Sequence, residues 1–175
     1  LFATAEQPPE TPLSDADLIR QYRERCEYVI DQVVESTDPA DLTRGSSFTI
    51  AANLRRGTNL EWARQRLRLS NDPPSGGMFW MHPMALLMEN GRGVLNDDDW
   101  AFIRELWRTY FPYRGDTENH WIMYYVSLYL AAEMFPEAGP EAWYNGKSSV
   151  EIMADAKGYI LDWMRITTSY GQGEY

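Results

Sequence analysis

The stretch Asp116-Thr117-Glu118-Asn119-His120-Trp121 opens the apolar run Ile122-Met123-Tyr124-Tyr125-Val126-Ser127-Leu128-Tyr129-Leu130. Asp and Thr are typical residues at the start of a helix, so the sequence predicts a central helix that begins here and ends before Pro136. Because the run is apolar throughout, this is expected to be the most buried helix of the protein. Its first turn places an amide, Asn119, beside an imidazole, His120.

Helical patterns continue on both sides of this central stretch. Apolar residues recur at three- and four-residue steps, which is typical of amphipathic helices. These segments start at Ser, Asn or Asp and stop near Pro or Gly, the residues that commonly begin and end helices. They cover residues 14–37, 59–69, 84–90, 96–111 and 148–168.

The pattern as a whole predicts an all-α protein of stacked antiparallel helical hairpins. Residues 39–58 stay open between a short strand and a helical turn, and no other stretch alternates like a strand. Residues 14–175 are expected to form a single helical domain after an extended, Pro-rich N-terminal arm at residues 1–13. Because the sequence stops just after a glycine-rich turn, we expect the domain to be the front part of a larger one.

Composition narrows the possible partners. The net charge is −10, the basic residues are almost all Arg, and no basic tract occurs, so neither nucleic acid nor an anionic membrane surface is an expected partner. An acidic protein can still bind an acidic ligand where Arg side chains converge, because guanidinium pairs with carboxylate in two-pronged fashion. Aromatic residues make up 14% of the chain, which fits either a ring-lined cleft or a ring-filled core.

Cysteine and histidine are too few for the usual metal sites. The single Cys26 cannot form an internal disulfide or a cysteine metal site, and its place on an apolar helix face predicts a buried thiol. The two histidines, His82 and His120, lack the spacing of a metal motif, so we expect no metal and no other cofactor. No apolar run reaches the roughly 18 residues of a spanning helix, so no membrane insertion is expected.

The first residues bear on localisation. Leu1-Phe2-Ala3-Thr4-Ala5 resembles the tail of a secretory signal, with small residues before a cleavage point. This pattern predicts a secreted or periplasmic protein, although an arbitrary boundary in the sequence would look the same.

The segment Thr117-Glu118-Asn119-His120-Trp121-Ile122-Met123-Tyr124 resembles the signature of polyuronate lyases built on an (α/α) toroid, the alginate lyases among them. That group usually has a second Asn where this chain has Glu118. The resemblance extends over about residues 97–175, and its specific part is the Asn-His pair. It implies that the helices form part of an (α/α) toroid and that the protein cleaves an acidic, uronate-containing polysaccharide by β-elimination.

The resemblance also implies roles for individual residues. Asn119 would neutralise the uronate carboxylate, and His120 would assist it or remove the proton from the neighbouring ring carbon. The family has an Arg further on and a Tyr that returns a proton to the leaving oxygen. In the corresponding region this chain has Arg165, Tyr170 and Tyr175, and Tyr175 is preferred because the loop before it could face a cleft. Arg165 has the alternative role of a charge that complements a helix C-terminus.

Substrate-binding residues are expected around this pair and in one further loop. Glu118, Trp121 and Tyr124 flank the pair on the same helix. Trp80 and His82 follow Gly76-Gly77 and would form a stacking platform for sugar, unless Trp80 enters the core.

Other functions remain open at this stage. The chain is alternatively a helical module that binds glycan without cleaving it. A glycoside hydrolase on the same scaffold would need two carboxylates in one cleft, for which Glu118 and Glu174 are the candidates. Arg64, Arg66 and Arg68 would bind an acidic chain or simply form a solvated helix face. The sequence does not predict the polysaccharide, its linkage or the oligomeric state.

Overall fold

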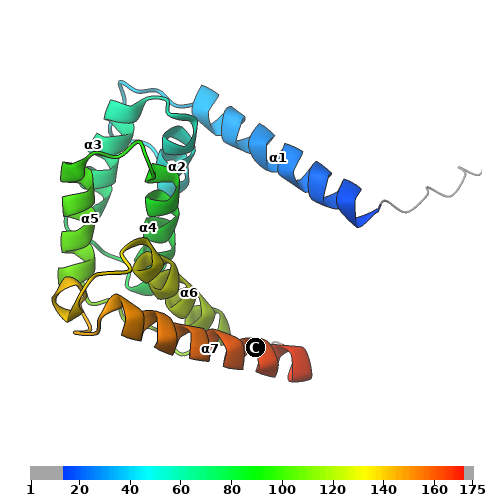
Figure 1. The fold of residues 1–175 in the computed structure, drawn as a ribbon. Coiled ribbons are helices and arrows are strands. Elements are labelled where there is room, and N and C mark those ends of the chain that lie inside the picture. Colours follow the sequence, from blue (N-terminus) through cyan, green and yellow to red (C-terminus); the bar gives the residue numbers. More distant parts are fainter. Residues whose placement is uncertain (1–13, 172–175) are drawn as a thin grey trace, which may run out of the picture.

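Residues 14–171 are described by a computed structural model, in which they form seven α-helices and one 3₁₀ turn and contain no strand (Figure 1). The prediction of an all-α protein is therefore confirmed. The expected N-terminal arm at residues 1–13 lies outside the described residues. In chain order the elements are α1 (Asp15–Glu35), α2 (Ser47–Arg56), α3 (Leu60–Asn71), α4 (Met78–Gly91), α5 (Asp97–Thr109), α6 (Glu118–Met134), η1 (Pro140–Ala142) and α7 (Ser149–Tyr170).

Five helices, α1, α3, α5, α6 and α7, begin at residues that the sequence predicts, and three of these starts are capped by a side chain. The side chain of Ser14 accepts a hydrogen bond from the backbone of the first turn of α1. Asn96 and Ser148 start α5 and α7 with complete capping boxes, in which cap and third residue bond each other reciprocally. These caps satisfy N–H groups that otherwise lack a partner at a helix start.

Two helices differ from the expectation. The undecided segment 39–58 contains a regular helix, α2, which ends at Gly57 in the left-handed conformation that favours glycine. Helix α4 starts at Met78, six residues before the predicted position, and includes Pro83 in its second turn. Gly77 starts this helix at a φ of 59°, and its backbone N–H donates to the hydroxyl of Tyr110 at 2.8 Å. This anchored glycine turn, and not the proline, sets the beginning of α4.

Helix α4 forms the centre of the core. It packs against α2 on one side and α6 on the other, and eight of its 14 residues are buried. The large rings of Trp80 and Trp107 meet there with centroids 4.9 Å apart. Other fully buried side chains around this contact are Ile50, Leu54, Leu67, Met81, Met84, Leu87, Met88, Ile103 and Ile152.

The arginines of α3 hold the fold together. Arg64 and Arg68 share a helix face, as their spacing predicts, and both pair with Asp99, whose side chain is only 2% exposed. Arg66 donates instead to backbone carbonyls of the α1–α2 connection. A freely solvated face is therefore not what the structure shows, whereas binding of an acidic chain by these arginines stays a prediction. A buried carboxylate requires such paired donors, so these contacts are structural.

The expectation that the central helix would be the most buried one is wrong. In α6 only Ser127, Leu128, Ala131 and Ala132 are buried, out of 17 residues. The helix packs mainly against α4 and α7. Its apolar side chains are consequently half-buried, and Leu130 is exposed.

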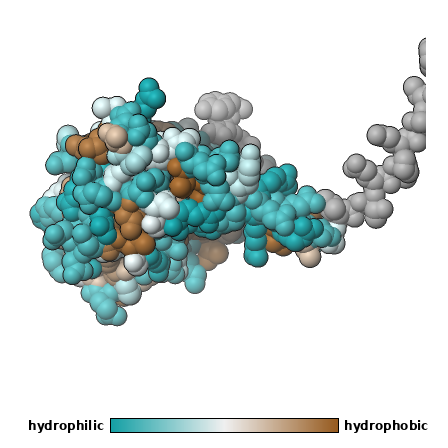
Figure 2. All heavy atoms as spheres, turned by 90° about the horizontal axis from the view of Figure 1, so that it is seen from above, coloured by the Kyte–Doolittle hydropathy of each residue, from teal (hydrophilic) through white to brown (hydrophobic). Residues whose placement is uncertain are grey.

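Helix α1 projects from the compact part of the molecule, on the side opposite the α6–α7 hairpin (Figure 1). It has no buried residue, and Leu18 and Tyr22 on its apolar stripe are exposed. Seen from the α1 side, the surface is mostly hydrophilic with separate apolar patches (Figure 2). Cys26 is half-buried, so the expectation of a buried thiol is wrong, because only the last turns of α1 reach α2.

None of the helices within residues 14–171 combines the length and the apolar character needed to cross a membrane.

Candidate functional site

The start of α6 is held by the loop that precedes it. Gly115 adopts a φ of 79°, and its Cα lies against the ring of His120, so closely that an added Cβ would be 2.7 Å from Nδ1. On its other side His120 meets the edge of the Phe79 ring, with centroids 5.1 Å apart. A glycine is needed here both for the backbone conformation and for the space. The loop at Gly115 and helix α4 together fix the His120 imidazole at the start of α6.

Asn119 is oriented by bonds within the same turn. Its Oδ1 accepts from the backbone N–H of His120 at 2.8 Å and from the hydroxyl of Thr117. The amide oxygen is thus used internally. No acceptor is found for the Asn119 Nδ2 group among the described residues, so the donor end of the amide remains available to a ligand.

Arg114 adds a positive charge to this end of the helix. Its guanidinium lies over the ring of Trp121, 4.1 Å from the centroid. Within residues 14–171 it forms no ion pair, and its Nη1 is buried without a hydrogen-bond partner. Sequence reasoning did not assign this residue to the site. Gly115 is the feature of the sequence that could have indicated Arg114. A glycine between an arginine and a helix start allows a tight turn, which can bring the arginine back against the first turn of that helix.

A groove of about 420 Å³ runs between the start of α6 and the second half of α7. Two tryptophans and three carboxylates line it, together with two threonines, an isoleucine and a glycine. Its lining residues are Asp116, Thr117, Glu118, Trp121, Asp162, Trp163, Ile166, Thr167 and Gly171. Grooves of this size and mixed lining are typical of small-ligand sites.

The predicted residues lie on two sides of the first turn of α6. Glu118 and Trp121 face α7 and line the groove. His120 faces α4 and does not line it. Asn119 adjoins the groove through Thr117, a lining residue that donates its hydroxyl to the Asn119 oxygen. The structure therefore brings Glu118 and Trp121 into the groove, leaves Asn119 beside it, and places His120 against α4.

Tyr124 lies one turn further along α6 and bonds to a second tyrosine. Its hydroxyl shares a hydrogen bond with the hydroxyl of Tyr144, whose ring edge meets Phe111. Burial raises the pKa of Tyr144 far above its ordinary value, and the neighbouring Tyr124 raises it further. The pKa of Tyr125 is also raised, mainly by burial and then by Tyr159. Tyr144 and Tyr125 therefore stay protonated near neutral pH and do not supply a base there.

Two other predicted residues, Trp80 and His82, lie away from this site, and a third, Arg165, lies beside the groove without lining it. Trp80 is buried in the core and donates its Nε1–H to the side chain of Asn71 at 2.8 Å, so the alternative in which it enters the core is the one the structure shows. His82 is exposed on α4. Arg165 is exposed on α7 and makes a 3.6 Å contact with Asp162.

Two further predicted residues lie outside the described residues: Tyr175, proposed for proton transfer, and Glu174, one of the two hydrolase candidates. The described part of the chain offers another carboxylate opposite Glu118, because Asp162 lines the same groove from α7.

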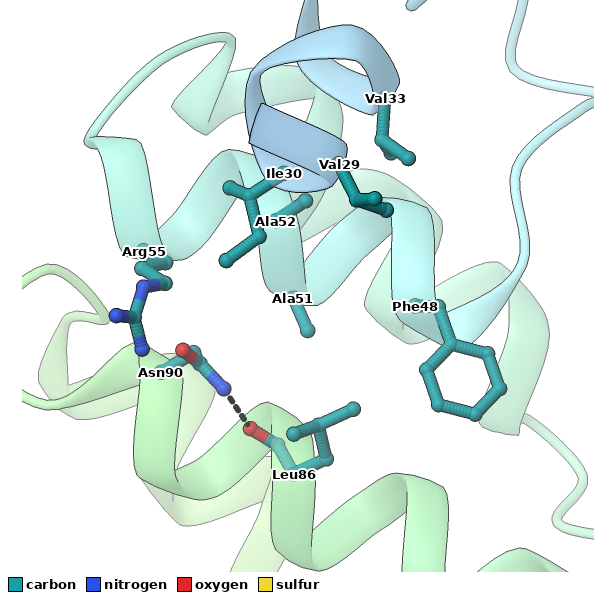
Figure 3. Close-up of a pocket in the computed structure, with 9 residues that line it drawn as sticks. All are labelled: Val29, Ile30, Val33, Phe48, Ala51, Ala52, Arg55, Leu86 and Asn90. Carbon is teal, nitrogen blue, oxygen red and sulfur yellow. Dashed lines mark hydrogen bonds between the residues drawn. The ribbon is translucent and has the colours of Figure 1, made fainter. Parts of the chain in front are cut away.

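A second hollow, of about 240 Å³, lies between α1, α2 and α4 (Figure 3). Val29, Ile30 and Val33 point into it from α1. Its polar groups are engaged elsewhere: Arg55 pairs with Glu27, and the Asn90 amide donates to the carbonyl of Leu86 at 2.8 Å. With no polar group directed at a ligand, this hollow is a gap in helix packing.

No group of three or more His, Cys, Asp or Glu side chains within residues 14–171 lies close enough together to hold a metal ion. Protein-family models, curated proteins and solved structures were compared with the chain, and none of them matches it.

Proposed function

We propose that the start of α6 binds the carboxylate of a uronate in an acidic polysaccharide, and that the protein cleaves this polymer by β-elimination. The observation that carries the proposal is the orientation of Asn119. Its side-chain oxygen already accepts hydrogen bonds from Thr117 and from the backbone N–H of His120. Its two amide hydrogens are therefore available at a helix N-terminus, where backbone N–H groups and the helix dipole already favour an anion.

Arg114 supports the same assignment. It has no carboxylate partner within the described residues, and the aromatic ring of Trp121 holds it in place. A guanidinium without an ion pair is well suited to a ligand carboxylate, because it offers several donors in a planar fork. Amide and guanidinium together would neutralise the carboxylate charge.

Neutralising the carboxylate acidifies the hydrogen on the adjacent ring carbon. A base removes this proton, and the electron pair of the C–H bond forms a carbon–carbon double bond. The glycosidic oxygen then leaves with its electron pair and takes up a proton. His120 is the proposed base, because it is part of the same helix turn as Asn119, whereas burial raises the pKa of the nearby Tyr144 and keeps that hydroxyl protonated. Its protonated imidazole would then supply the proton to the leaving oxygen.

We also propose that these helices form one part of an (α/α) toroid and that the protein is secreted or periplasmic. The toroid is supported by the incomplete burial of α6, which has four buried residues out of 17 and in a closed ring of hairpins would meet further helices. The localisation rests on the sequence alone.

A second function, glycan binding without cleavage, is favoured by one specific feature of the site. His120 lies on the α4 side of the turn, whereas the groove lies on the α7 side. A sugar in the groove would meet tryptophan rings and acceptor groups but no imidazole. If the groove alone is used, the protein binds and does not cleave.

Formation of unsaturated uronate tests the proposal. The absorbance of the new double bond is followed on alginate, glucuronan and other uronate polymers with the full-length protein. Asn119→Ala and His120→Ala should each lower the rate by about 100-fold or more, whereas Glu89→Gln, an exposed change on α4, should not. Binding without any unsaturated product favours the glycan-binding module. New reducing ends without unsaturation favour a hydrolase that uses Glu118 and Asp162.

A further inference from the structure

The groove between α6 and α7 is lined by carboxylates and tryptophan rings, and the proposed elimination assigns no role to most of these side chains. Three of its lining side chains are carboxylates: Asp116, Glu118 and Asp162. No Lys or Arg lines it. Asp116 and Glu118 form no ion pair within residues 14–171, and Asp162 has only the exposed 3.6 Å contact with Arg165. Carboxylates accept hydrogen bonds and do not donate them, so the groove favours hydroxyl donors and repels a second anion.

The rings of the groove provide the apolar part of a sugar site. Trp121 is fixed by Arg114 on its face and by Tyr159, whose ring edge meets it with centroids 5.3 Å apart. Trp163 approaches from α7. Because tryptophan has few rotatable bonds and a large face, it contacts the apolar side of a pyranose at low entropic cost. Rings beside hydrogen-bond acceptors are what an uncharged sugar needs.

The groove adjoins the proposed uronate position. Thr117 lines the groove and donates its hydroxyl to Asn119, which is the proposed carboxylate ligand. Asn119 precedes Trp121 by two residues, about 3 Å along the helix axis, and the guanidinium of Arg114 lies 4.1 Å from the centroid of the Trp121 ring. The donors proposed for the uronate therefore border the groove directly, and a sugar residue next to the uronate would lie against the groove's carboxylates.

From this juxtaposition we infer that the groove binds an uncharged sugar residue next to the uronate. The substrate is then a mixed polysaccharide, in which uronates alternate with neutral sugars, and not a polymer of uronates alone. The inference rests on the proposed function, since it names the sugar that neighbours the bound uronate. It assigns Glu118 and Asp162 to substrate selection by charge.

Binding of two oligosaccharides of equal length tests this inference by titration calorimetry with the full chain at low salt. The first, from hyaluronan, alternates glucuronate with uncharged N-acetylglucosamine. The second, from glucuronan, carries a carboxylate on every residue. We expect the protein to bind the hyaluronan fragment about tenfold more tightly. The preference should shrink as salt screens the repulsion.

Charge-removing variants distinguish repulsion from shape. Glu118→Gln combined with Asp162→Asn should raise the affinity for the glucuronan fragment about fivefold and leave that for hyaluronan no higher than before. Glu89→Gln combined with Asp98→Asn removes the same charge from exposed positions on α4 and α5 and should change neither affinity. A purely structural role of Glu118 and Asp162 would not improve binding of any ligand.

The outcomes separate the two ideas. If neither oligosaccharide binds and no uronate polymer is cleaved, the proposed function fails and the inference fails with it. If the protein binds glucuronan as tightly as hyaluronan, and the double variant changes nothing, the selection of a neutral sugar is wrong while uronate binding stands.

Discussion

Helices α4 and α6 are the two most apolar segments of the chain, and they are used in opposite ways. Eight of 14 residues are buried in α4, against four of 17 in α6. The first lies between α2 and α6 in the middle of the core. The second is covered on two sides, and its first turn carries the groove and the Asn119–His120 pair. Apolar composition therefore does not by itself determine which helix is buried.

The difference lies in the neighbours that each helix finds. At the start of α4, Trp80 is enclosed by Trp107 and Tyr110 and its only polar atom bonds to Asn71. At the start of α6, Trp121 carries a charged guanidinium on its face and borders a groove. An enclosed ring contributes to stability, whereas a ring at an open edge can contact a ligand.

Matched leucine substitutions should give the largest contrast between the helices. Leu87→Ala in α4 removes a fully buried side chain and should cost about 2–5 kcal/mol of unfolding free energy, from lost burial and a cavity. Leu130→Ala in α6 removes a side chain that is 42% exposed and should cost roughly 1 kcal/mol or less. Urea denaturation measures both. Equal losses would mean that α6 is as enclosed as α4.

A pair of glycine substitutions tests how the loop holds the α6 start. Gly115→Ala and Gly93→Ala both force an alanine into a left-handed backbone, at about 1–2 kcal/mol each. Only at Gly115 does the new methyl group collide with His120. We expect NMR signals of the His120 ring to move in Gly115→Ala and to stay in place in Gly93→Ala. Unmoved His120 signals in both variants would show that the loop does not position the imidazole.

The Tyr124–Tyr144 pair offers a smaller, pH-dependent test of the buried side of α6. The pKa of Tyr144 is higher in the folded protein than in the unfolded chain, where it is about 10, so the folded state holds the proton more tightly. Stability from this group is complete below pH 10 and falls above it, by about 1.4 kcal/mol per pH unit. Tyr144→Phe should flatten this fall in unfolding experiments. An unchanged slope would mean that Tyr144 is accessible to water.

The sequence was sufficient for the all-α class and for most helix limits, because caps such as Ser14, Asn96 and Ser148 act through neighbouring residues alone. It failed where tertiary contacts decide. Pro83 was taken as a boundary, yet Gly77 and Tyr110 start α4 earlier. The burial of α6 was overestimated because the apolar residues of a helix do not indicate how many other helices pack against it.

The candidate site was predictable only where its residues belong to one local sequence motif. Glu118 and Trp121, which were predicted from a local motif, line one groove, and Asn119 adjoins it through Thr117. Trp163 and Asp162 come from α7, more than forty positions away, and no periodicity relates them to α6. Arg114 was overlooked because its role depends on how the loop turns back over Trp121.

The most direct test of the account is where a uronate ligand binds. Backbone NMR signals are recorded during a titration with a hyaluronan oligosaccharide, and the changes are mapped onto the chain. We predict that the largest changes fall on residues 114–121 and on Asp162–Thr167 of α7, while the core of α4 stays unchanged, and that Asn119→Ala abolishes those at the α6 start. Changes confined to other surfaces, or the same changes in Asn119→Ala, would contradict a uronate site at the first turn of α6.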